Sequence, residues 1–518
     1  MAKPPCPIEL AEWLVSQPSV NGDKNSENAM AERIALELTR LGLDAGFWRT
    51  GEGRRSVWAL SLNNESPDVY VLLSHYDTVG LAEYASAGLA HIAFDSNALA
   101  DRFAAGGFGA DLGTDARSGD YAFGRGALDM KSGIAAQISA LARKPSANVL
   151  FVSCPDEEAG STGILSALGP MLELAAERGL RYRAVINSDY TAPCYPGDTS
   201  KYIYLGAIGK LLPSVLIAGI TSHVGEPYQG IDACFLAAEL VRDVSLNPDL
   251  CDRVGAEVSV PPLALRSRDL KTTYDTQTAF QSHVFINVMT YSQSPSRVLH
   301  KIRALAESAA LRALERRRTS YESYSKGRKV APPAELTPTV LLYEDLPAEC
   351  RTEATRTATE VLPVGTDPRE VSLTIVRQAA RLAKVERPFM VVYLSPPYYP
   401  HVHTPEEGFR DEMQAFATAN GFELRDFYPY ISDVSYVGGA GDRAHLRAIA
   451  ANIPQWEAPL LGYGLPESAM HGLGCPIVTV GPRGKEAHGL GERVEKASIQ
   501  LASDMVARLL GCAVDLER

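Results

Sequence analysis

The chain has 518 residues and a formal net charge of -12, with 46% hydrophobic and 22% charged residues. This length exceeds what one hydrophobic core supports, so we expect two or three domains. The composition is that of a globular protein, and the acidic balance disfavours nucleic-acid binding because phosphates require a basic surface. No apolar stretch is long enough to span a membrane, and the N-terminus lacks a basic region followed by an apolar one. We therefore expect a cytoplasmic protein with neither nucleic-acid nor membrane partners.

The first 205 residues have the pattern of an α/β domain. Residues 8–43 predict a helical segment that includes an amphipathic helix at about 28–41. Continuous apolar runs rich in β-branched residues then alternate with helical stretches, which is typical of strands buried on both faces. The expected strands lie at 69–74, 148–153 and 183–188, with helices at 131–142 and 163–178.

Residues 206–330 change in character and predict a separate α+β module inserted into this domain. Strand-like runs at 211–220 and 282–291 accompany expected helices at 232–244 and 295–318. Apolar runs at 389–395 and 476–481 then resume the pattern of buried strands. We therefore expect a mostly parallel-sheet catalytic domain formed by residues 1–205 and 331–518, with residues 206–330 as the inserted module.

Candidate metal ligands follow four of the predicted buried strands. Ligands in open α/β sheets bind beyond the carboxyl ends of the strands, so these four segments should meet at one edge. A fifth acid, Asp129, lies in the small-residue segment GRGALDMKSG, where the backbone approaches closely and a helix begins. The residues that follow the strands are His75 and Asp77, Glu157 and Glu158, Asp189, and His488.

Each of these elements is weak by itself. An isolated HxD is more often a structural pair, an EE dipeptide is usually a solvated helix start, and one late histidine is commonly a surface residue. Together they favour a metal site, because imidazole and carboxylate suit zinc, cobalt or manganese.

Charge arithmetic favours two metal ions over one. Three carboxylates and two neutral imidazoles leave two divalent ions with about one positive charge, which a bridging hydroxide cancels. A fourth carboxylate is then available for proton transfer, and either Glu157 or Glu158 is suitable. Asp77 is placed to orient the His75 imidazole as a hydrogen-bond acceptor.

The order of motifs resembles a known family. HxD, GRGxxDxKSG, DEExGSxG, an Asp after a strand and a late GPxGxxxHxxxERV are similar to the dinuclear zinc metallopeptidases that include aminoacylase, peptidase T and succinyl-diaminopimelate desuccinylase. YASAGLAHIAFD, FYPYISDVSY and GPRGKEAHGLGERV resemble its RocB-like arginine utilisation subgroup. The resemblance implies that Asp129 bridges two metals, that His75 and Asp189 complete one site, that Glu158 and His488 complete the other, and that Glu157 is the general base.

The resemblance also implies that residues 206–330 form a lid that mediates homodimerisation. His223 matches a lid histidine that helps to hold the substrate or the oxyanion, although a strand-end histidine with a local partner is the structural alternative. Two departures stand out: a long segment separates His75 from Asp129, and the usual lid motif for the substrate carboxylate is missing.

The leading hypothesis is a metal-dependent amidohydrolase or exopeptidase that cleaves a small peptide or an N-acyl amino acid, with a link to arginine or ornithine metabolism. The expected cofactors are two divalent ions, with zinc first and cobalt or manganese as alternatives. Rival hypotheses are a regulatory metal-binding protein of the same fold and a hydrolase of ester or ureido groups. His401 and His403 form an HxH pair, for which a structural role is favoured.

Overall fold

The computed structural model describes residues 5–195, 197–363, 365–403, 407–438, 443–456 and 465–512. The chain divides into two compact units. Unit 1 comprises Met1–Ala207, Val402–Ala440 and Pro466–Arg518, and unit 2 comprises Ile208–His401 and Gly441–Leu465. No helix of the described residues is long and apolar enough to cross a membrane.

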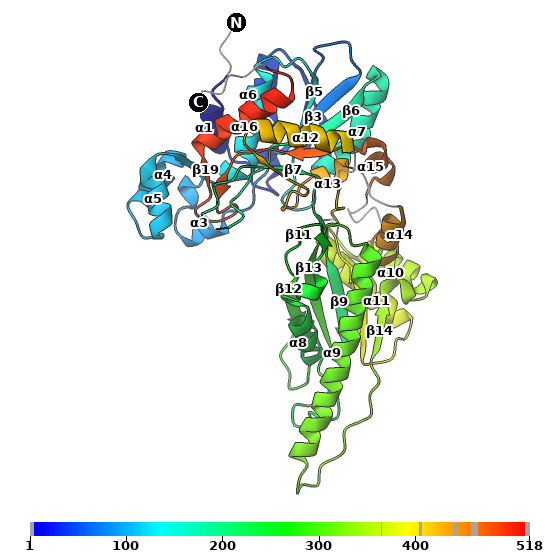
Figure 1. The fold of residues 1–518 in the computed structure, drawn as a ribbon. Coiled ribbons are helices and arrows are strands. Elements are labelled where there is room, and N and C mark those ends of the chain that lie inside the picture. Colours follow the sequence, from blue (N-terminus) through cyan, green and yellow to red (C-terminus); the bar gives the residue numbers. More distant parts are fainter. Residues whose placement is uncertain are drawn as a thin grey trace. The chain divides into compact units, whose positions relative to one another are not determined.

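Unit 1 is built on an eight-stranded sheet with the order β1-β2-β5-β3-β6-β17-β7-β16 (Figure 1). Its centre, β5-β3-β6-β17, is parallel, and the outer pairs β1-β2, β2-β5 and β17-β7 are antiparallel. The strands are β1 (Asp44–Arg49), β2 (Arg55–Ser61), β3 (Asp68–His75), β5 (Asn148–Cys154), β6 (Arg181–Asn187), β7 (Tyr202–Leu205), β16 (Glu423–Arg425) and β17 (Ile477–Thr479).

Helices cover both faces of this sheet, which explains why its central strands are apolar throughout. One face carries the large core formed with α1, α2, α6, α12 and α16, and the other carries α7, α13 and α15 (Figure 1). These helices are α1 (Pro7–Val15), α2 (Lys24–Arg40), α6 (Ser132–Leu141), α7 (Thr162–Arg178), α12 (Glu407–Ala419), α13 (Val434–Val437), α15 (Glu467–Leu473) and α16 (Lys496–Leu509).

Unit 1 also contains a small sheet and a helical insertion. The three-stranded sheet has the order β18-β19-β4 and joins β4 (Tyr121–Phe123) to the late hairpin of β18 (Gly484–Lys485) and β19 (Arg493–Glu495). The helices of the insertion lie between β3 and β4 and share a core of their own. They are α3 (Ala82–Ser86), α4 (Ser96–Ala104) and α5 (Ala110–Ser118).

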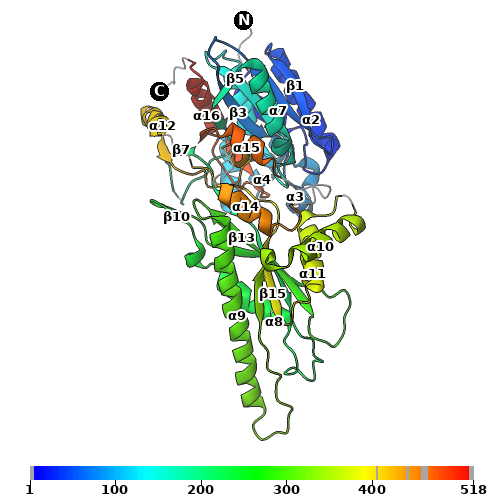
Figure 2. The same cartoon turned by 90° about the vertical axis from the view of Figure 1, so that its right-hand side faces the viewer.

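Unit 2 is an α+β structure with a six-stranded sheet, in which β12-β13-β9-β15-β14 form the main path and β8 pairs with β13. Figure 2 shows α9 and the pair α10 and α11 on opposite sides of β15. The strands are β8 (Gly209–Leu211), β9 (Pro213–Ala218), β12 (Leu263–Asp269), β13 (Gln281–Thr290), β14 (Thr339–Leu342) and β15 (Phe389–Leu394), and the short β10 (Arg253–Val254) and β11 (Glu257–Val258) pair separately. The helices are α8 (Ala233–Val244), α9 (Pro295–Tyr324), α10 (Ala348–Val361), α11 (Pro368–Leu382) and α14 (Arg443–Asn452).

The division differs from the expected boundary at residue 330. The sequence places the apolar run at 389–395 in the catalytic domain, whereas β15 pairs with β9 and β14 in the sheet of unit 2. The strand is buried along its whole length, so its composition resembles that of the central strands of unit 1. The composition of β15 therefore does not indicate which of the two sheets the strand joins.

Candidate metal centre and active site

The first group of candidate ligands lies at the carboxyl edge of the sheet in unit 1. His75 is the last residue of β3, Asp189 follows β6, and Asp129 precedes α6. Ligand atoms of these three buried residues lie within 4.8 Å of one another. His75 Nε2 is 2.9 Å from Asp129 Oδ1. The predicted convergence of β3, β6 and the Asp129 segment is therefore present in the fold.

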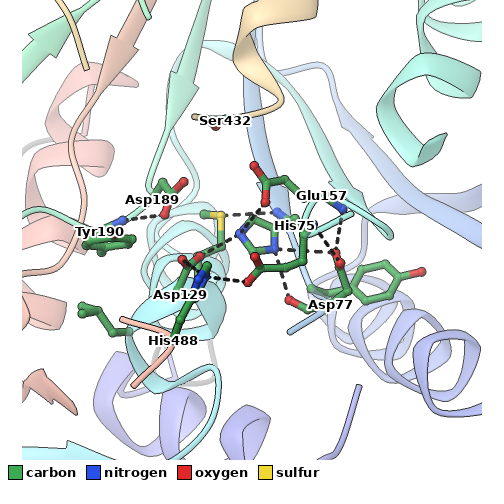
Figure 3. Close-up of polar contacts among 12 residues, drawn as sticks. His75, Asp77, Asp129, Glu157, Asp189, Tyr190, Ser432 and His488 are labelled. Carbon is green, nitrogen blue, oxygen red and sulfur yellow. Dashed lines mark hydrogen bonds and ion pairs between the residues drawn. The ribbon is translucent and has the colours of Figure 1, made fainter. Parts of the chain in front are cut away.

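A second group shares Asp129. It adds Glu158, from the turn between β5 and α7, and His488, from the loop between β18 and β19. His488 Nε2 lies 3.0 Å from Asp129 Oδ2 and 3.0 Å from Glu158 Oε1. Asp129 thus faces His75 with one carboxylate oxygen and His488 with the other (Figure 3). This is the arrangement that a carboxylate bridging two cations requires.

Glu157 belongs to neither group, although it lies beside the first. Its Oε2 is 4.0 Å from His75 Nε2, and its side chain is only 9% exposed. Burial raises the pKa of Glu157 well above its usual value, His75 opposes this shift, and the nearby charge of Asp433 adds to it. A buried carboxyl whose pKa is raised suits proton transfer.

Asp77 holds the turn that carries both glutamates. Its Oδ1 accepts the backbone N–H of Glu157 at 3.1 Å, and its Oδ2 accepts that of Glu158 at 3.2 Å. Asp77 Oδ1 lies 3.6 Å from His75 Nδ1, while the Asp77 carbonyl oxygen lies closer to the same nitrogen, at 3.2 Å. Asp77 therefore orients His75 through its backbone carbonyl and, through its carboxylate, fixes the Glu157–Glu158 turn.

The turn between β5 and α7 has an unusual backbone that its own hydrogen bonds support. Asp156 and Ser161 have positive φ values of 68° and 55°. The Asp156 carbonyl accepts the N–H of Ser161 at 2.6 Å, and its carboxylate accepts the Thr162 hydroxyl at 2.6 Å. The DEExGSxG motif is thus a closed turn that presents both glutamates at the sheet edge.

The electrostatics of the two groups suit divalent cations. Burial and the charge of Asp129 raise the pKa of Asp189 to about 8. Hydrogen bonds to Asp129 and Glu158 raise the pKa of His488 to about 11. Among the described residues, the buried Glu158 Oε1 has no polar partner besides the His488 imidazole. Three carboxylates and two imidazoles crowded in this way match the donor preferences of zinc, cobalt and manganese.

Several residues that support the site were not found from the sequence. Glu492 accepts the N–H groups of Leu128 and Asp129 at 3.1 and 3.3 Å. Arg125 pairs with Glu492 at 2.5 Å and donates to the His488 carbonyl at 2.9 Å. Arg125 and Glu492 lie within the quoted GRG and ERV motifs, so their motif membership was the available signal.

Asp433 and Asn21 were also missed. Asp433 is buried, and burial raises its pKa to about 7 against the effect of the Ser161 hydroxyl. Asn21 donates its amide to Asp77 Oδ2 at 2.8 Å and to Asp156 Oδ1 at 3.1 Å. Asn21 lies in a turn-prone stretch, and nothing in its local sequence indicates a partner so distant in the chain.

The remaining candidate histidines belong to, or border, unit 2. His223 is exposed, its Nδ1 accepts the N–H of Gly225 at 3.1 Å, and its backbone forms a bridge with Gln277. The ring of His401 lies 5.7 Å from that of His445, and Thr290 is 3.3 Å from His401 Nδ1. His403, in unit 1, lies against the Phe427 ring. In the described part of the chain, none of these histidines joins a group of candidate metal ligands.

The chain belongs to peptidase family M20/M25/M40, whose family model matches residues 71–421. It is therefore a hydrolytic enzyme of the metallopeptidase class. It is 31% identical to protein RocB of Bacillus subtilis (strain 168) over 473 residues, covering 86% of this chain and 82% of RocB. It is 30% identical to YqjN of the same strain over 515 residues, covering 94% and 92% of the two chains.

Solved structures support the fold. The structure of a tripeptidase from Staphylococcus aureus subsp. aureus Mu50 matches with a TM-score of 0.55 and 16% identity, covering 99% of this chain and 98% of the tripeptidase. The predicted family and fold class are both confirmed.

Proposed function

We propose that this protein is a two-metal hydrolase that cleaves the amide bond of a small peptide or an N-acyl amino acid. The observation that carries the proposal is the sharing of Asp129 by two groups of ligands, with Glu157 beside them but in neither group. His75, Asp129 and Asp189 would hold one ion, and Asp129, Glu158 and His488 the other. Zinc is the expected metal, with cobalt or manganese as alternatives that the same ligands accept.

Two such ions, when bound, would supply an acidified water and a polarised carbonyl at neutral pH. The chain's own residues then account for positioning and proton transfer. Glu157 takes the proton from the attacking water and gives it to the leaving nitrogen. The Asp77 carboxylate holds Glu157 and Glu158 in position by accepting their backbone N–H groups. Burial of His75, Asp129 and Asp189 keeps bulk water away from three of the ligands, which strengthens their electrostatic interactions.

The substrate class rests on resemblance. Likeness to the RocB-like arginine utilisation subgroup supports a derivative of arginine or ornithine as the substrate, and relatives in the family include peptidases. Ester or ureido hydrolysis is the alternative reaction, since the same two-metal site could activate water for either bond. A panel of amide, ester and carbamoyl compounds with matched side chains separates these reactions.

The substitution Glu157→Gln tests the proposal. The glutamine side chain keeps the volume of the glutamate and cannot accept the proton, so we expect kcat to fall by roughly 10²–10⁴-fold while two metal ions remain bound. Metal content by elemental analysis and turnover of a peptide and N-acyl amino-acid panel are the measurements. Glu173→Gln, on the exposed surface of α7, is the matched control.

The outcomes separate three cases. Two bound ions with unchanged turnover in Glu157→Gln would show that Glu157 is not the base. Two bound ions without turnover of any panel compound by the unsubstituted protein would favour a regulatory metal-binding protein. Absence of bound metal from the unsubstituted protein, purified without chelator and supplied with each ion, would contradict the two-metal proposal.

We also propose that unit 2 contributes a lid to a homodimer and that His223 contacts the substrate or the oxyanion. The family resemblance and the exposure of His223 support this role. If His223 acts in the partner subunit's site, mixing Glu157→Gln chains with His223→Ala chains should restore part of the activity. If heterodimers form but no activity is recovered, His223 has a structural role instead.

A further inference from the structure

The helical insertion between β3 and β4 has no part in the mechanism described so far. Its helices α3, α4 and α5 bury a cluster separate from the main core of unit 1, with Tyr84, Leu99, Phe103 and Leu112 among its members. Leu490, in the loop between β18 and β19, packs against this cluster. The insertion therefore contacts the loop that carries the candidate ligand His488.

A partly buried charge cluster makes the second connection between the insertion and this loop. Asp115, on α5, places Oδ2 2.7 Å from Arg493 Nε and 2.8 Å from Lys485 Nζ. The exposed fraction of the side chain is 14% for Asp115 and 2% for Arg493. Burial opposes ionisation of Asp115, but Lys485 and Arg493 prevail and lower its pKa. Because Lys485 and Arg493 are paired residues of the β18-β19 hairpin, Asp115 clamps both strands.

Arg493 connects Asp115 to the loop that carries His488. Its Nη1 donates to Glu486 Oε1 at 2.6 Å and to the Gly491 carbonyl at 2.8 Å, on either side of His488. His488 has a positive φ of 65°, and 47% of its side chain is exposed. A half-exposed imidazole on a strained backbone is held by its loop more than by packing, so the shape of the loop sets the position of Nε2.

We propose that Asp115 is a positioning residue for His488 and that the helical insertion thereby sets the metal affinity of the second ligand group. The inference rests on the proposed two-metal centre. In Figure 1 the helices α4 and α5 lie beside β19, the strand that begins with Arg493. Asp115 acts by orienting the Arg493 guanidinium, whose bonds to Glu486 and Gly491 then close the loop around His488.

The test is metal binding by the apoprotein, independent of turnover. The variant Asp115→Asn keeps the size of the side chain but removes the charge that holds Arg493 and Lys485. Loss of a residue that hydrogen-bonds a metal ligand weakens metal affinity about 10–100-fold, and because Asp115 acts through Arg493 we expect the lower end of this range, about 10-fold. We expect that loss for one of the two equivalents of Co²⁺, measured by titration of the chelator-treated protein, together with a change in the visible spectrum of that equivalent.

Matched variants separate positioning from general stability. Asp111→Asn changes an exposed aspartate in the first turn of the same helix and should leave both equivalents unchanged. Asp115→Glu keeps the charge and should restore part of the affinity. If Asp115→Asn does not fold, as judged by circular dichroism, Lys485→Met removes the more exposed partner and should weaken the same equivalent to a smaller degree.

Three results would overturn the inference. Identical binding of both equivalents by a folded Asp115→Asn protein would show that Arg493 needs no help from the insertion. Equal weakening of both equivalents in Asp115→Asn would indicate that Asp115 has only a structural role. If Asp115→Asn does not fold, an unchanged metal affinity in folded Lys485→Met would indicate the same. Failure of the unsubstituted protein to bind two ions would instead contradict the proposed metal centre.

Discussion

At the scale of single residues, Asn21 connects the N-terminal segment to the site. Its amide donates to Asp77 and Asp156, and the backbone N–H of Asn21 donates to the Thr78 carbonyl at 2.8 Å. Arg54 also reaches Asp156, at 2.5 Å. Asn21 is therefore the neutral donor between two acids that shape the Glu157–Glu158 turn.

Removal of the Asn21 amide should lower turnover or metal affinity at the active site. The variant Asn21→Ala leaves two buried carboxylates short of a donor, at a cost of about 1–3 kcal/mol in unfolding free energy. The turn that Asp77 holds would loosen, so we expect turnover or metal affinity to fall by roughly 10-fold or more. Steady-state kinetics and a metal titration measure this. Asn97→Ala, at an exposed position of α4, is the control, and equal behaviour of the two variants would refute the role.

The sequence reveals these residues unequally. His75, Asp129, Glu158, Asp189 and His488 were predicted because the resemblance and the strand ends both indicate them. Asn21 and Asp77 are separated by 56 positions, and their contact exists only after β3 and the N-terminal turn have folded. A side-chain bond between distant segments has no local pattern from which it could be predicted.

At the scale of elements, close backbone approaches hold the ligands at the sheet edge. Gly481 follows β17, and a Cβ on this residue would lie 1.8 Å from the Asp189 carbonyl oxygen. A Cβ on Gly133, in the first turn of α6, would lie 2.1 Å from the Ser188 carbonyl oxygen. Both glycines let β17 and α6 pack directly against the segment that ends in Asp189.

A methyl group at position 481 should therefore be poorly tolerated. The variant Gly481→Ala must push the Asp189 backbone away, and we expect it to lower the unfolding free energy by about 3 kcal/mol, the upper end of the usual cost of overpacking. Urea denaturation followed by circular dichroism measures this. Gly408→Ala, where a Cβ on α12 meets open space, should change the value by no more than about 0.5 kcal/mol. Similar stability of both variants would show that the backbone at Asp189 can shift at little cost in free energy.

Most elements were predictable because their periodicity and flanking residues are strong. The helix expected at 28–41 begins earlier, at Lys24, because the Asp23 side chain accepts the N–H groups of Asn25 and Ser26. The helix expected at 295–318 continues to Tyr324. The sheet to which β15 belongs was predicted wrongly, since burial on both faces produces the same composition in either sheet.

At the scale of the whole molecule, each unit has its own hydrophobic core. The cluster around Leu72, Phe151 and Ile186 lies in unit 1, and the cluster around Leu216, Val376 and Val391 lies in unit 2. All the proposed metal ligands belong to unit 1. Ligand binding stabilises the folded state of the part that binds it, so the effect of metal should be local.

Metal removal should consequently act on one unit. After treatment with a chelator, we expect faster amide hydrogen exchange in peptides from β3, β5 and β6, and unchanged exchange in β9, β13 and β15. At a metal concentration about 100 times the Kd, the stabilisation lost is about 2.7 kcal/mol. Mass spectrometry of peptic fragments measures the difference. Equal acceleration in both units would mean that they unfold together and that the separate cores do not act independently.

The junction of the two units has a consequence for variation in chain length. The chain leaves unit 1 at Ala207 and returns at Val402, and these two residues exchange backbone hydrogen bonds of 3.0 and 2.9 Å as an antiparallel bridge. Two neighbouring chain ends joined in this way resemble the base of a hairpin. An insertion at such a turn leaves the strand order of the sheet unchanged, because the flanking chain ends keep their positions. Residues 208–401 thus begin and end at neighbouring positions of unit 1, where a change in their length need not move the flanking backbone.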